Sequence, residues 1–549
     1  MIIFLIKQHS FLGFLPDTTP TNGHLSEENQ LVDDEGGEPK SKHAKLQTLQ
    51  GEAQTIDLSL TLDYTNDEFG QKLQKQWFKE SKDDFKDSKT QAEVYTDPFQ
   101  ICILPELLKN QESCKLLVKE MVEKVHWSRK QMDLYEFYQS TDLSNMIECK
   151  FLANFLQMLR RSVRPWLEKV TNLKLDYVSA SCSMYTCGDY LLVHDDLLKD
   201  RQIAFIYYLS PWDSNETWSK EQGGCLEIFS SDEKSLPQFP AKRKISPKNN
   251  QFAFFKVGSR SFHQVGEVTT FDYPRLTING WFHGATNEDL MAETLRPFNK
   301  LQFRPPQEPT SKSLDNLLNE VYLKPTTKRS IQKRIEDNSE ICLYEFFRRE
   351  IFEEALKQLL TDTELKWSRQ GPANAQNYEV LDLRTSSKAV AELIQTFSNS
   401  EMFALLREFT DLDLAGPNSS KPLFSLEVQR WSHGDYTVLA DGAICDENTL
   451  DLIYYLNASE GAAVITYLSP DSEQAHPSQK SSSQSDTDSL EGEGFDDDDE
   501  SVLLTITPVD NALNIVYRCE GTTKFTRYVS RNTPLDKGPV FVISCSYKE

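Results

Sequence analysis

Histidines and carboxylates are the first residues to consider, because together they can hold a metal ion. Four of the nine histidines lie in segments whose residue pattern indicates β-strands: His194, His263, His283 and His433. His194 stands in the run VHDD, two residues before Asp196. On a strand, residues i and i+2 point to the same face, so we expect the His194 imidazole and the Asp196 carboxylate to project together while Asp195 points away. The sequence thus offers two ligands on one strand.

A third ligand is needed to hold a divalent cation, and His263 can supply it from another strand. It follows the apolar run FAFFKV, in the sequence SFHQ. Two histidines and one carboxylate leave three coordination positions open, which non-heme Fe(II) oxygenases use for cosubstrate and dioxygen. The competing interpretation is three core side chains satisfied by hydrogen bonds, with no metal. We interpret His283 as a rim residue and His433 as a turn residue, rather than as ligands.

An arginine adds a second part to this predicted site. Arg275 lies twelve residues past His263 and directly precedes the run LTINGWF. A guanidinium inside a barrel needs an anionic partner, and its own strand contains no acidic residue, so we expect Arg275 to bind a ligand carboxylate. Tyr208, in the run IAFIYYLS, could donate its hydroxyl to the same carboxylate.

The elements that must position these residues follow from hydrophobic periodicity. Helical spacing extends over residues 106–125 and again over 146–170, with an interruption before Pro165. From Tyr177 onward, short runs of β-forming residues alternate with Gly, Pro, Asp and Asn clusters. Closely spaced short strands predict a sandwich or barrel, so the fold is expected to be mainly β with α-helical support.

Three landmarks recur in the same order, which indicates an internal repeat. WSR occurs at 127–129 and 367–369, GDY at 188–190 and 434–436, and YYL at 207–209 and 454–456. We infer two tandem copies of one unit, at 96–290 and 340–549, each with a helical lead-in. A linker is expected at 291–339, a mostly disordered polar leader at 1–95 and a disordered acidic loop at 471–500.

Composition narrows the function classes. The 549 residues carry a net charge of -25, which argues against broad contact with phosphate backbones and makes nucleic acid an improbable partner. Four cations at 328, 329, 333 and 334 fit an exposed helix face better than a nucleic-acid patch. The ten cysteines form no CxxC pair, which suits a reducing compartment. No stretch reaches the length of a membrane span, so no membrane is expected as a partner.

The candidate residues stand in an order that resembles a known family: Tyr185, His194, Asp196, Tyr208, Gly223, Gly224, His263, Arg275 and Trp281. With the motifs HDDLL, RQIAFIYYLSPW, SFHQVGEV and LTINGWFHG, the chain resembles the prolyl-hydroxylase branch of the 2-oxoglutarate and Fe(II)-dependent dioxygenases. Within that branch it is similar to the ribosomal prolyl hydroxylases. The resemblance covers about 96–549, the acidic loop excepted.

The resemblance implies roles for these residues. His194, Asp196 and His263 would hold Fe(II) and carry the catalysis, while Arg275 and Tyr208 would bind the distal carboxylate of 2-oxoglutarate, with Tyr185 at the same cosubstrate. It also implies two double-stranded β-helix (jelly-roll) domains, O2 as cosubstrate, ascorbate (vitamin C) as an auxiliary reductant, and 3-hydroxylation of a proline in a small-subunit ribosomal protein, with an effect on translation.

The second copy departs from the first at the ligand positions. GDYLLVHDD becomes GDYTVLADG, which places Ala440 at the His194 position and Gly442 at the Asp196 position. Lys524 falls near the His263 position, and the strand that begins at 539–541 has no arginine. We therefore predict that the second copy binds neither iron nor 2-oxoglutarate and serves dimerisation, substrate docking or stability.

Three alternatives stay open at this point. The same triad could hydroxylate another protein or a small molecule, because it fixes the oxidant and not the substrate. Both copies could instead form a non-catalytic binding scaffold, and a metal phosphohydrolase could use His194 and Asp195, although its ligands would need helices. The sequence permits both cytoplasm and nucleus and leaves homodimerisation open.

Overall fold

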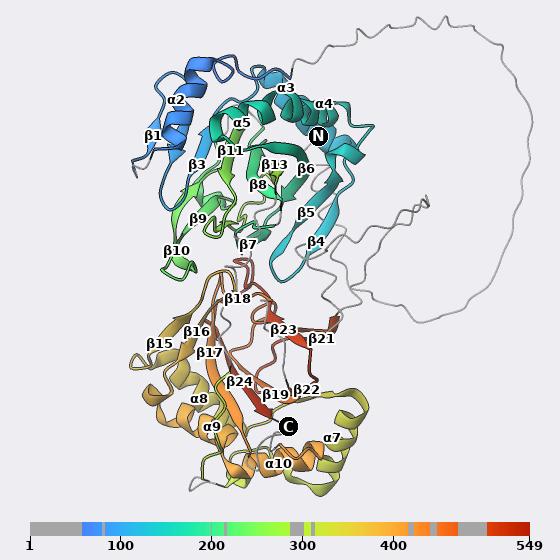
Figure 1. Ribbon diagram of the computed structural model, residues 1–549. Helices are drawn as coiled ribbons and strands as arrows, with labels where there is room; N and C mark the ends of the chain where they lie inside the picture. Colours follow the sequence, from blue (N-terminus) through green and yellow to red (C-terminus); the bar gives the residue numbers. More distant parts are fainter. Residues whose placement is uncertain are drawn as a thin grey trace, which may run out of the picture.

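The computed structural model describes residues 58–79, 83–198, 200–212, 217–285, 301–308, 313–414, 422–439, 447–469 and 502–548. These residues form two lobes, each with helices on the side facing away from the other lobe (Figure 1). Among the described residues, no helix combines the length and the apolar character that crossing a membrane requires.

The first lobe is built on thirteen antiparallel strands. They are β1 (Phe85–Lys86), β2 (Glu93–Tyr95), β3 (Ile101–Leu104), β4 (Ser128–Gln131), β5 (Tyr135–Asp142), β6 (Leu175–Tyr185), β7 (Tyr190–His194), β8 (Arg201–Tyr208), β9 (Leu226–Ser231), β10 (Pro237–Ile245), β11 (Gln251–Lys256), β12 (His263–Val265) and β13 (Arg275–Gly284). Their order is β1-β2-β3-β11-β8-β13-β6-β5-β7-β12-β9-β10, with β4 paired to β5.

Helices cover one face of the β11-β8-β13-β6 layer. They are α2 (Asp67–Trp77), α3 (Gln111–Lys124), α4 (Lys150–Met158) and α5 (Arg164–Thr171), with a π-helical turn at Leu159–Val163 and 3-10 turns at Leu143–Asn145 and Lys220–Gln222. Alternate residues of β13, including Leu276 and Ile278, pack into the helix-covered core. The residues between them, beginning with Arg275, therefore face the other side of the layer.

The expected disordered leader at 1–95 is wrong for its last part. Residues 58–79 and 83–95 are ordered, and α2 buries Phe69, Leu73 and Trp77 in the core of the first lobe. These three residues recur at intervals of four along one face of a single short helix. The helix is short and most of its other residues are polar or charged, so the composition of the segment suggested disorder although its apolar residues keep helical spacing. Residues 1–57 lie outside the described part of the chain.

The second lobe repeats the strand order of the first. Its strands are β14 (Glu340–Leu343), β15 (Trp367–Gln370), β16 (Gln376–Leu381), β17 (Phe424–Trp431), β18 (Tyr436–Thr437), β19 (Thr449–Leu456), β20 (Ile465–Leu468), β21 (Val502–Ile506), β22 (Leu513–Arg518), β23 (Thr523–Thr526) and β24 (Val540–Lys548). The order β14-β22-β19-β24-β17-β16-β15 corresponds strand by strand to β3-β11-β8-β13-β6-β5-β4. The order β21-β20-β23 corresponds to β10-β9-β12.

The expected linker at 291–339 is also partly wrong. The helices of the second lobe are α7 (Pro325–Asn338), α8 (Arg349–Thr361), α9 (Lys388–Ser398) and α10 (Ser400–Thr410), with 3-10 turns at Leu314–Asn316, Glu320–Leu323 and Leu383–Thr385. Ile331 and Ile335 of α7 are buried in the core of this lobe. The chain already pairs with the second lobe at Arg304, opposite Phe424, and at Gln307, opposite Asn399. The sequence pattern did not indicate this because apolar residues are sparse here among prolines and charged residues. The acidic loop at 471–500 lies outside the described residues.

Two of the repeated sequence landmarks meet each other inside each lobe. Arg129 of the first WSR forms an ion pair with Asp189 of the first GDY at 2.7 Å. Arg369 and Asp435 form the corresponding pair at 2.5 Å. The same contact therefore forms in both lobes. It joins the first strand of a hairpin, β4 or β15, to the turn that precedes β7 or β18.

The lobes touch through the tyrosines of the two GDY landmarks. Tyr190, Leu192, Tyr436 and Val438 form one buried apolar cluster, and Tyr528 packs against it. The rings of Tyr190 and Tyr528 lie 4.2 Å apart, centroid to centroid. Figure 1 shows β7 and β18 at this junction, so the strand that carries His194 lies at the contact between the lobes.

Candidate active site

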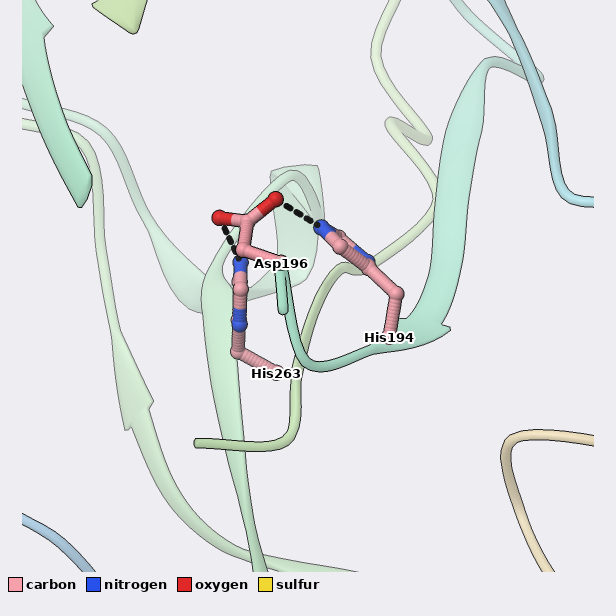
Figure 2. A group of neighbouring side chains, drawn as sticks. All are labelled: His194, Asp196 and His263. Atoms are coloured by element: carbon pink, nitrogen blue, oxygen red, sulfur yellow. Dashed lines mark ion pairs between the residues drawn. The ribbon is translucent and has the colours of Figure 1, made fainter. Parts of the chain in front are cut away.

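The first two predicted ligands are neighbours, but not because they share a strand face. His194 is the last residue of β7, and Asp196 follows in a turn with a positive φ of 63°. This left-handed backbone conformation is uncommon for a residue other than glycine and redirects the side chain. The Asp196 carboxylate returns toward His194, with Oδ1 3.6 Å from the His194 Nε2 (Figure 2). The expected proximity is found, while the expected reason, strand alternation, is wrong.

His263 joins this pair through strand pairing. In the β7-β12 ladder His263 lies opposite His194, and the two imidazole centroids are 4.2 Å apart. The Nε2 of His263 lies 3.5 Å from Asp196 Oδ2. One ligand atom from each of His194, Asp196 and His263 falls within 4.8 Å of the others, so the structure brings the three predicted ligands together.

The outer nitrogens of both imidazoles are fixed by the backbone. The Nδ1 of His194 lies 2.8 Å from the Leu192 carbonyl, and the Nδ1 of His263 lies 2.8 Å from the Ser261 carbonyl. A nitrogen that faces a carbonyl oxygen donates a proton to it, which leaves the lone pair on Nε2. Both Nε2 atoms point at the Asp196 carboxylate, so the site presents two nitrogen donors and one oxygen donor.

The charge states suit a cation. Burial by itself raises the pKa of Asp196, but His194, His263 and Arg201 outweigh it, so this pKa lies below its ordinary value. Burial, followed by the neighbouring His194, lowers the pKa of His263 to about 4. At neutral pH the cluster therefore presents a carboxylate beside an unprotonated His263, the forms that bind a metal ion.

Arg201 is a site residue that the sequence analysis missed. Its guanidinium lies 3.5 Å from Asp196 Oδ1 and 3.5 Å above the ring of Trp281. Trp281 belongs to the LTINGWF run and Arg201 opens the run before Tyr208, but nothing in their spacing places either beside Asp196. The β13-β8 register brings Arg201 and Trp281 near each other, since Trp281 lies opposite Ala204 and His283 lies opposite Arg201.

Arg275 is buried in the same sheet as Arg201 and Trp281. It begins β13, lies opposite Tyr185 of β6, and is 1% exposed. Its Nε donates to the Gly224 carbonyl at 2.8 Å, while its Nη2 is buried and makes no hydrogen bond with any described residue. The guanidinium carbon lies 5.0 Å from the ring centre of Tyr185 and 5.2 Å from that of Tyr208.

Tyr208 leaves a second polar atom without a partner beside Arg275. Its hydroxyl is buried and makes no hydrogen bond with any described residue. Burial raises the pKa of Tyr208 to about 12, although the positive charge of Arg275 and the closeness of its side chain to the hydroxyl act against this rise. The phenol therefore keeps its proton and can donate it. Two buried unpaired donors side by side are costly unless an acceptor fills the space, and a carboxylate meets that requirement.

Two adjacent glycines allow close packing beside Arg275. Gly223 and Gly224 both have positive φ, at 68° and 63°. A Cβ on Gly223 would lie 1.9 Å from the Glu267 carbonyl oxygen, and one on Gly224 would lie 3.1 Å from the Cδ of Arg275. No side chain fits at Gly223, so the glycine pair lets the Glu267 carbonyl approach residue 223 and the Arg275 side chain approach residue 224.

The two remaining histidines have local partners. His283 Nε2 lies 2.7 Å from Ser179 Oγ, its Nδ1 lies 3.1 Å from Asp200, and its ring stacks on Tyr177 at 4.2 Å. His433 Nε2 contacts the Thr533 carbonyl at 2.9 Å. The structure places neither in the group formed by His194, Asp196 and His263.

The second lobe places different residues at the equivalent positions. In each lobe a valine exchanges backbone hydrogen bonds with the GDY turn, Val268 in the first and Val529 in the second. Counting back five residues from each valine sets Lys524 against His263. Lys524 Nζ lies 2.6 Å from the buried carboxylate of Asp451. Ala440 and Gly442, the expected replacements of His194 and Asp196, lie outside the described residues.

The register also identifies the counterpart of Arg275. Arg275 pairs with Tyr185 in the first lobe, and Val540 pairs with Trp431 in the second. Tyr185 and Trp431 each stand three residues before the glycine of a GDY landmark. Val540 is therefore the residue that replaces Arg275, as expected for a strand without an arginine at its start.

The donor set fits the cofactors that the sequence pattern suggested. Two imidazoles and one carboxylate that converge in this way are the ligands of non-heme Fe(II) oxygenases. The unpaired donors of Arg275 and Tyr208 fit one end of a dicarboxylate such as 2-oxoglutarate. Iron and 2-oxoglutarate would together supply an oxidant for C–H hydroxylation.

Comparisons with known proteins agree with this geometry. The model of the 2OG-Fe(II) oxygenase superfamily matches residues 180–283. The model described as oxoglutarate and iron-dependent oxygenase degradation C-term matches residues 310–549. The two matches fall on the two lobes, and the second begins close to the point where the chain joins the second lobe.

Three curated proteins show similarity along most of the chain. Prolyl 3-hydroxylase sudestada1 of Drosophila melanogaster is 65% identical over 94% of this chain and 95% of its own length. Prolyl 3-hydroxylase OGFOD1 of Mus musculus is 28% identical over 80% of this chain and 85% of its own length. Prolyl 3,4-dihydroxylase OGFOD1 of Ostreococcus tauri is 26% identical over 76% of this chain and 89% of its own length.

The similarity at 65% identity extends through both lobes, and the first lobe carries the donor set of an iron enzyme. The chemistry of this family requires Fe(II), 2-oxoglutarate and O2. With its triad and two unpaired donors for a carboxylate in place, the chain belongs to the OGFOD1 family of 2-oxoglutarate-dependent prolyl hydroxylases.

Proposed function

We propose that the protein hydroxylates carbon 3 of a prolyl residue in a small-subunit ribosomal protein and thereby affects translation. The observation that carries the proposal is the convergence of His194, Asp196 and His263 beside the unpaired donors of Arg275 and Tyr208. The position of hydroxylation is supported by the names of relatives, which include prolyl 3-hydroxylases from a fly and a mouse. The net charge of -25 suits a basic ribosomal protein as substrate.

In this function, separate residues of the first lobe bind the cosubstrate and the iron. Arg275 and Tyr208 donate to the distal carboxylate of 2-oxoglutarate, and Tyr185 packs beside the same guanidinium. His194, Asp196 and His263 hold the iron at the end of β7. Arg201 keeps Asp196 ionised and oriented through its 3.5 Å contact. The triad and the two donors together fix where a prolyl ring must stand to react.

The test uses purified full-length protein with Fe(II), 2-oxoglutarate and overlapping proline-containing peptides from small-subunit ribosomal proteins. We expect one peptide to stimulate succinate release and to gain 16 mass units, with 3-hydroxyproline found on amino-acid analysis. His194→Ala should abolish both signals, because it removes one iron ligand.

Three results would change the proposal in different ways. Formation of 4-hydroxyproline would contradict the assigned position, and a gain of 32 units would indicate two hydroxylations, as the name of the Ostreococcus tauri relative describes for that protein. If no ribosomal peptide stimulated turnover, the substrate assignment would be rejected in favour of another protein or a small molecule.

We also propose that each lobe is a double-stranded β-helix and that the second is non-catalytic. The repeated strand order and the repeated arginine-aspartate contact support common architecture. Lys524 and Val540, in place of His263 and Arg275, support the loss of the iron and 2-oxoglutarate sites. Stimulation by ascorbate, residence in both cytoplasm and nucleus, and formation of a homodimer are further proposals, to be checked by turnover with and without ascorbate, by imaging and by sedimentation.

A further inference from the structure

A buried carboxylate of the first lobe ends inside the second lobe. Glu267 lies between β12 and β13 and is 7% exposed. Its carboxylate accepts hydrogen bonds from the Ser530 hydroxyl, from the Arg531 backbone N–H at 2.9 and 3.0 Å, and from the Tyr528 hydroxyl at 3.2 Å. All three donors belong to the second lobe. A carboxylate that accepts hydrogen bonds from several donors is held in one geometry.

The main chain of the same residue lies against the 2-oxoglutarate end of the barrel. The Gly224 N–H donates to the Glu267 carbonyl at 3.0 Å. The Gly224 carbonyl in turn accepts from Arg275 Nε at 2.8 Å. The hydrogen-bond path from Glu267 to Arg275 thus runs through Gly224 alone. The neighbouring Gly223 lies so close to the Glu267 carbonyl that no side chain fits there.

We propose that the second lobe sets the position of Arg275 through Glu267, so that Glu267 is a positioning residue for binding of 2-oxoglutarate. The donors of Ser530 and Arg531 hold the Glu267 side chain. Glu267 then holds the 223–224 backbone, and Gly224 holds the guanidinium. This inference rests on the proposed role of Arg275 and deepens it, because it gives the non-catalytic lobe a part in cosubstrate affinity.

A second contact between the lobes provides a matched control. The Asp133 carboxylate, also in the first lobe and also buried, accepts from the Leu439 N–H of the second lobe at 2.6 Å. Asp133 lies in the β4-β5 hairpin, whereas Gly224 precedes β9 and Arg275 begins β13. Glu267 and Asp133 are therefore two interface carboxylates in different parts of the first lobe, and the main chain of Glu267 is joined through Gly224 to Arg275.

The experiment compares four variants of the full-length protein: Glu267→Ala, Ser530→Ala, Asp133→Ala and Arg275→Ala. The affinity for 2-oxoglutarate is measured by anaerobic titration of the Fe(II)-loaded protein, followed by visible absorbance. Turnover with peptide then gives the KM for 2-oxoglutarate and the kcat separately. Thermal unfolding of each variant reports loss of fold.

We expect Glu267→Ala to weaken 2-oxoglutarate binding about five- to twentyfold with kcat within about twofold. Ser530→Ala should weaken 2-oxoglutarate binding less. The double variant Glu267→Ala/Ser530→Ala should weaken it by less than the sum of the two single effects, because both changes interrupt one path. Asp133→Ala should leave 2-oxoglutarate affinity unchanged. If Glu267→Ala fails to fold, Glu267→Gln and Ser530→Ala test the same path.

Equal effects of Glu267→Ala and Asp133→Ala would overturn the inference, since they would indicate general loosening of the interface. A lower kcat with unchanged 2-oxoglutarate affinity would overturn it as well. If Arg275→Ala itself left 2-oxoglutarate affinity unchanged, the proposed role of Arg275 would fail first. Weak binding in Arg275→Ala together with normal binding in Glu267→Ala would reject this inference alone.

Discussion

The first lobe carries His263 where the second carries Lys524, and this pair shows two ways to balance charge inside one fold. In the first lobe an aspartate stands between two imidazoles, of which His263 has its pKa lowered to about 4. There the carboxylate contacts Arg201 at 3.5 Å and also faces two nitrogen donors, so the group can take a further cation from outside the chain. In the second lobe the lysine ammonium lies 2.6 Å from Asp451, with Arg518 at 3.7 Å. The cation there belongs to the chain.

A second difference concerns the buried end of the barrel. Arg275 leaves its Nη2 without a hydrogen-bond partner among the described residues, whereas the equivalent Val540 is buried in an apolar cluster. The first lobe thus keeps polar atoms unsatisfied at a cost in stability, and the second satisfies the same space with packing. The comparison teaches that one strand order accommodates either arrangement of side chains. The unsatisfied groups lie in the lobe that holds the three predicted metal ligands.

The largest effect is expected from exchanging the two residues that define the comparison. His263→Lys should reduce turnover by at least about a hundredfold, because it removes an iron ligand and adds a positive charge beside the site. Succinate release under saturating Fe(II) and 2-oxoglutarate measures this. Lys524→His should add no second iron, because Ala440 and Gly442 supply no other ligands. Bound iron at two per chain in that variant would break the comparison.

Exchanging the residues at the buried end should have the next largest effect. Arg275→Ala removes a charge-assisted contact to the cosubstrate carboxylate and should raise the KM for 2-oxoglutarate about ten- to hundredfold. Val540→Ala, at the matching position, should leave that KM unchanged while it lowers the melting temperature. Steady-state kinetics with varied 2-oxoglutarate distinguishes them, and equal KM shifts would contradict the separation of roles.

The internal ion pair of the second lobe should matter for stability alone. Lys524→Met leaves the buried Asp451 with a weaker partner and should lower the free energy of unfolding by about 2 kcal/mol. Lys548→Met removes a partly exposed pair with Glu447 and should cost less than about 1 kcal/mol. Urea titration compares the variants. Loss of iron binding in Lys524→Met would contradict a role of this ion pair in stability alone.

The smallest effect is a pH dependence of the metal-free protein. Because the folded-state pKa of His263 is about 4 against 6.5 in the unfolded chain, the unfolded state binds more protons between these values. The contribution of neutral His263 to the free energy of unfolding is therefore complete above pH 6.5. It is lost as the pH falls toward 4, by at most about 1.4 kcal/mol per pH unit. Denaturation of the metal-free protein across this range should show that slope. His263→Gln should flatten it, and an unchanged slope would contradict burial of a neutral imidazole.

Much of this arrangement could be predicted from the sequence, because motif spacing and periodicity are local properties. The strand runs, the three ligands, Arg275 and the Lys524 substitution all follow from patterns along the chain. The contact between Arg201 and Asp196 could not be predicted, because it depends on ladder register and on the positive φ of Asp196. The Glu267 contact could not be predicted either, since it depends on how two lobes dock.

The most direct test of the central claim is the amount of Fe(II) bound per full-length chain in the presence of 2-oxoglutarate under anaerobic conditions. The account predicts one Fe(II) per chain in the wild type, none in His194→Ala, and one in Lys524→Ala. Two Fe(II) per chain, or one retained in His194→Ala, would contradict the assignment of catalysis to the first lobe.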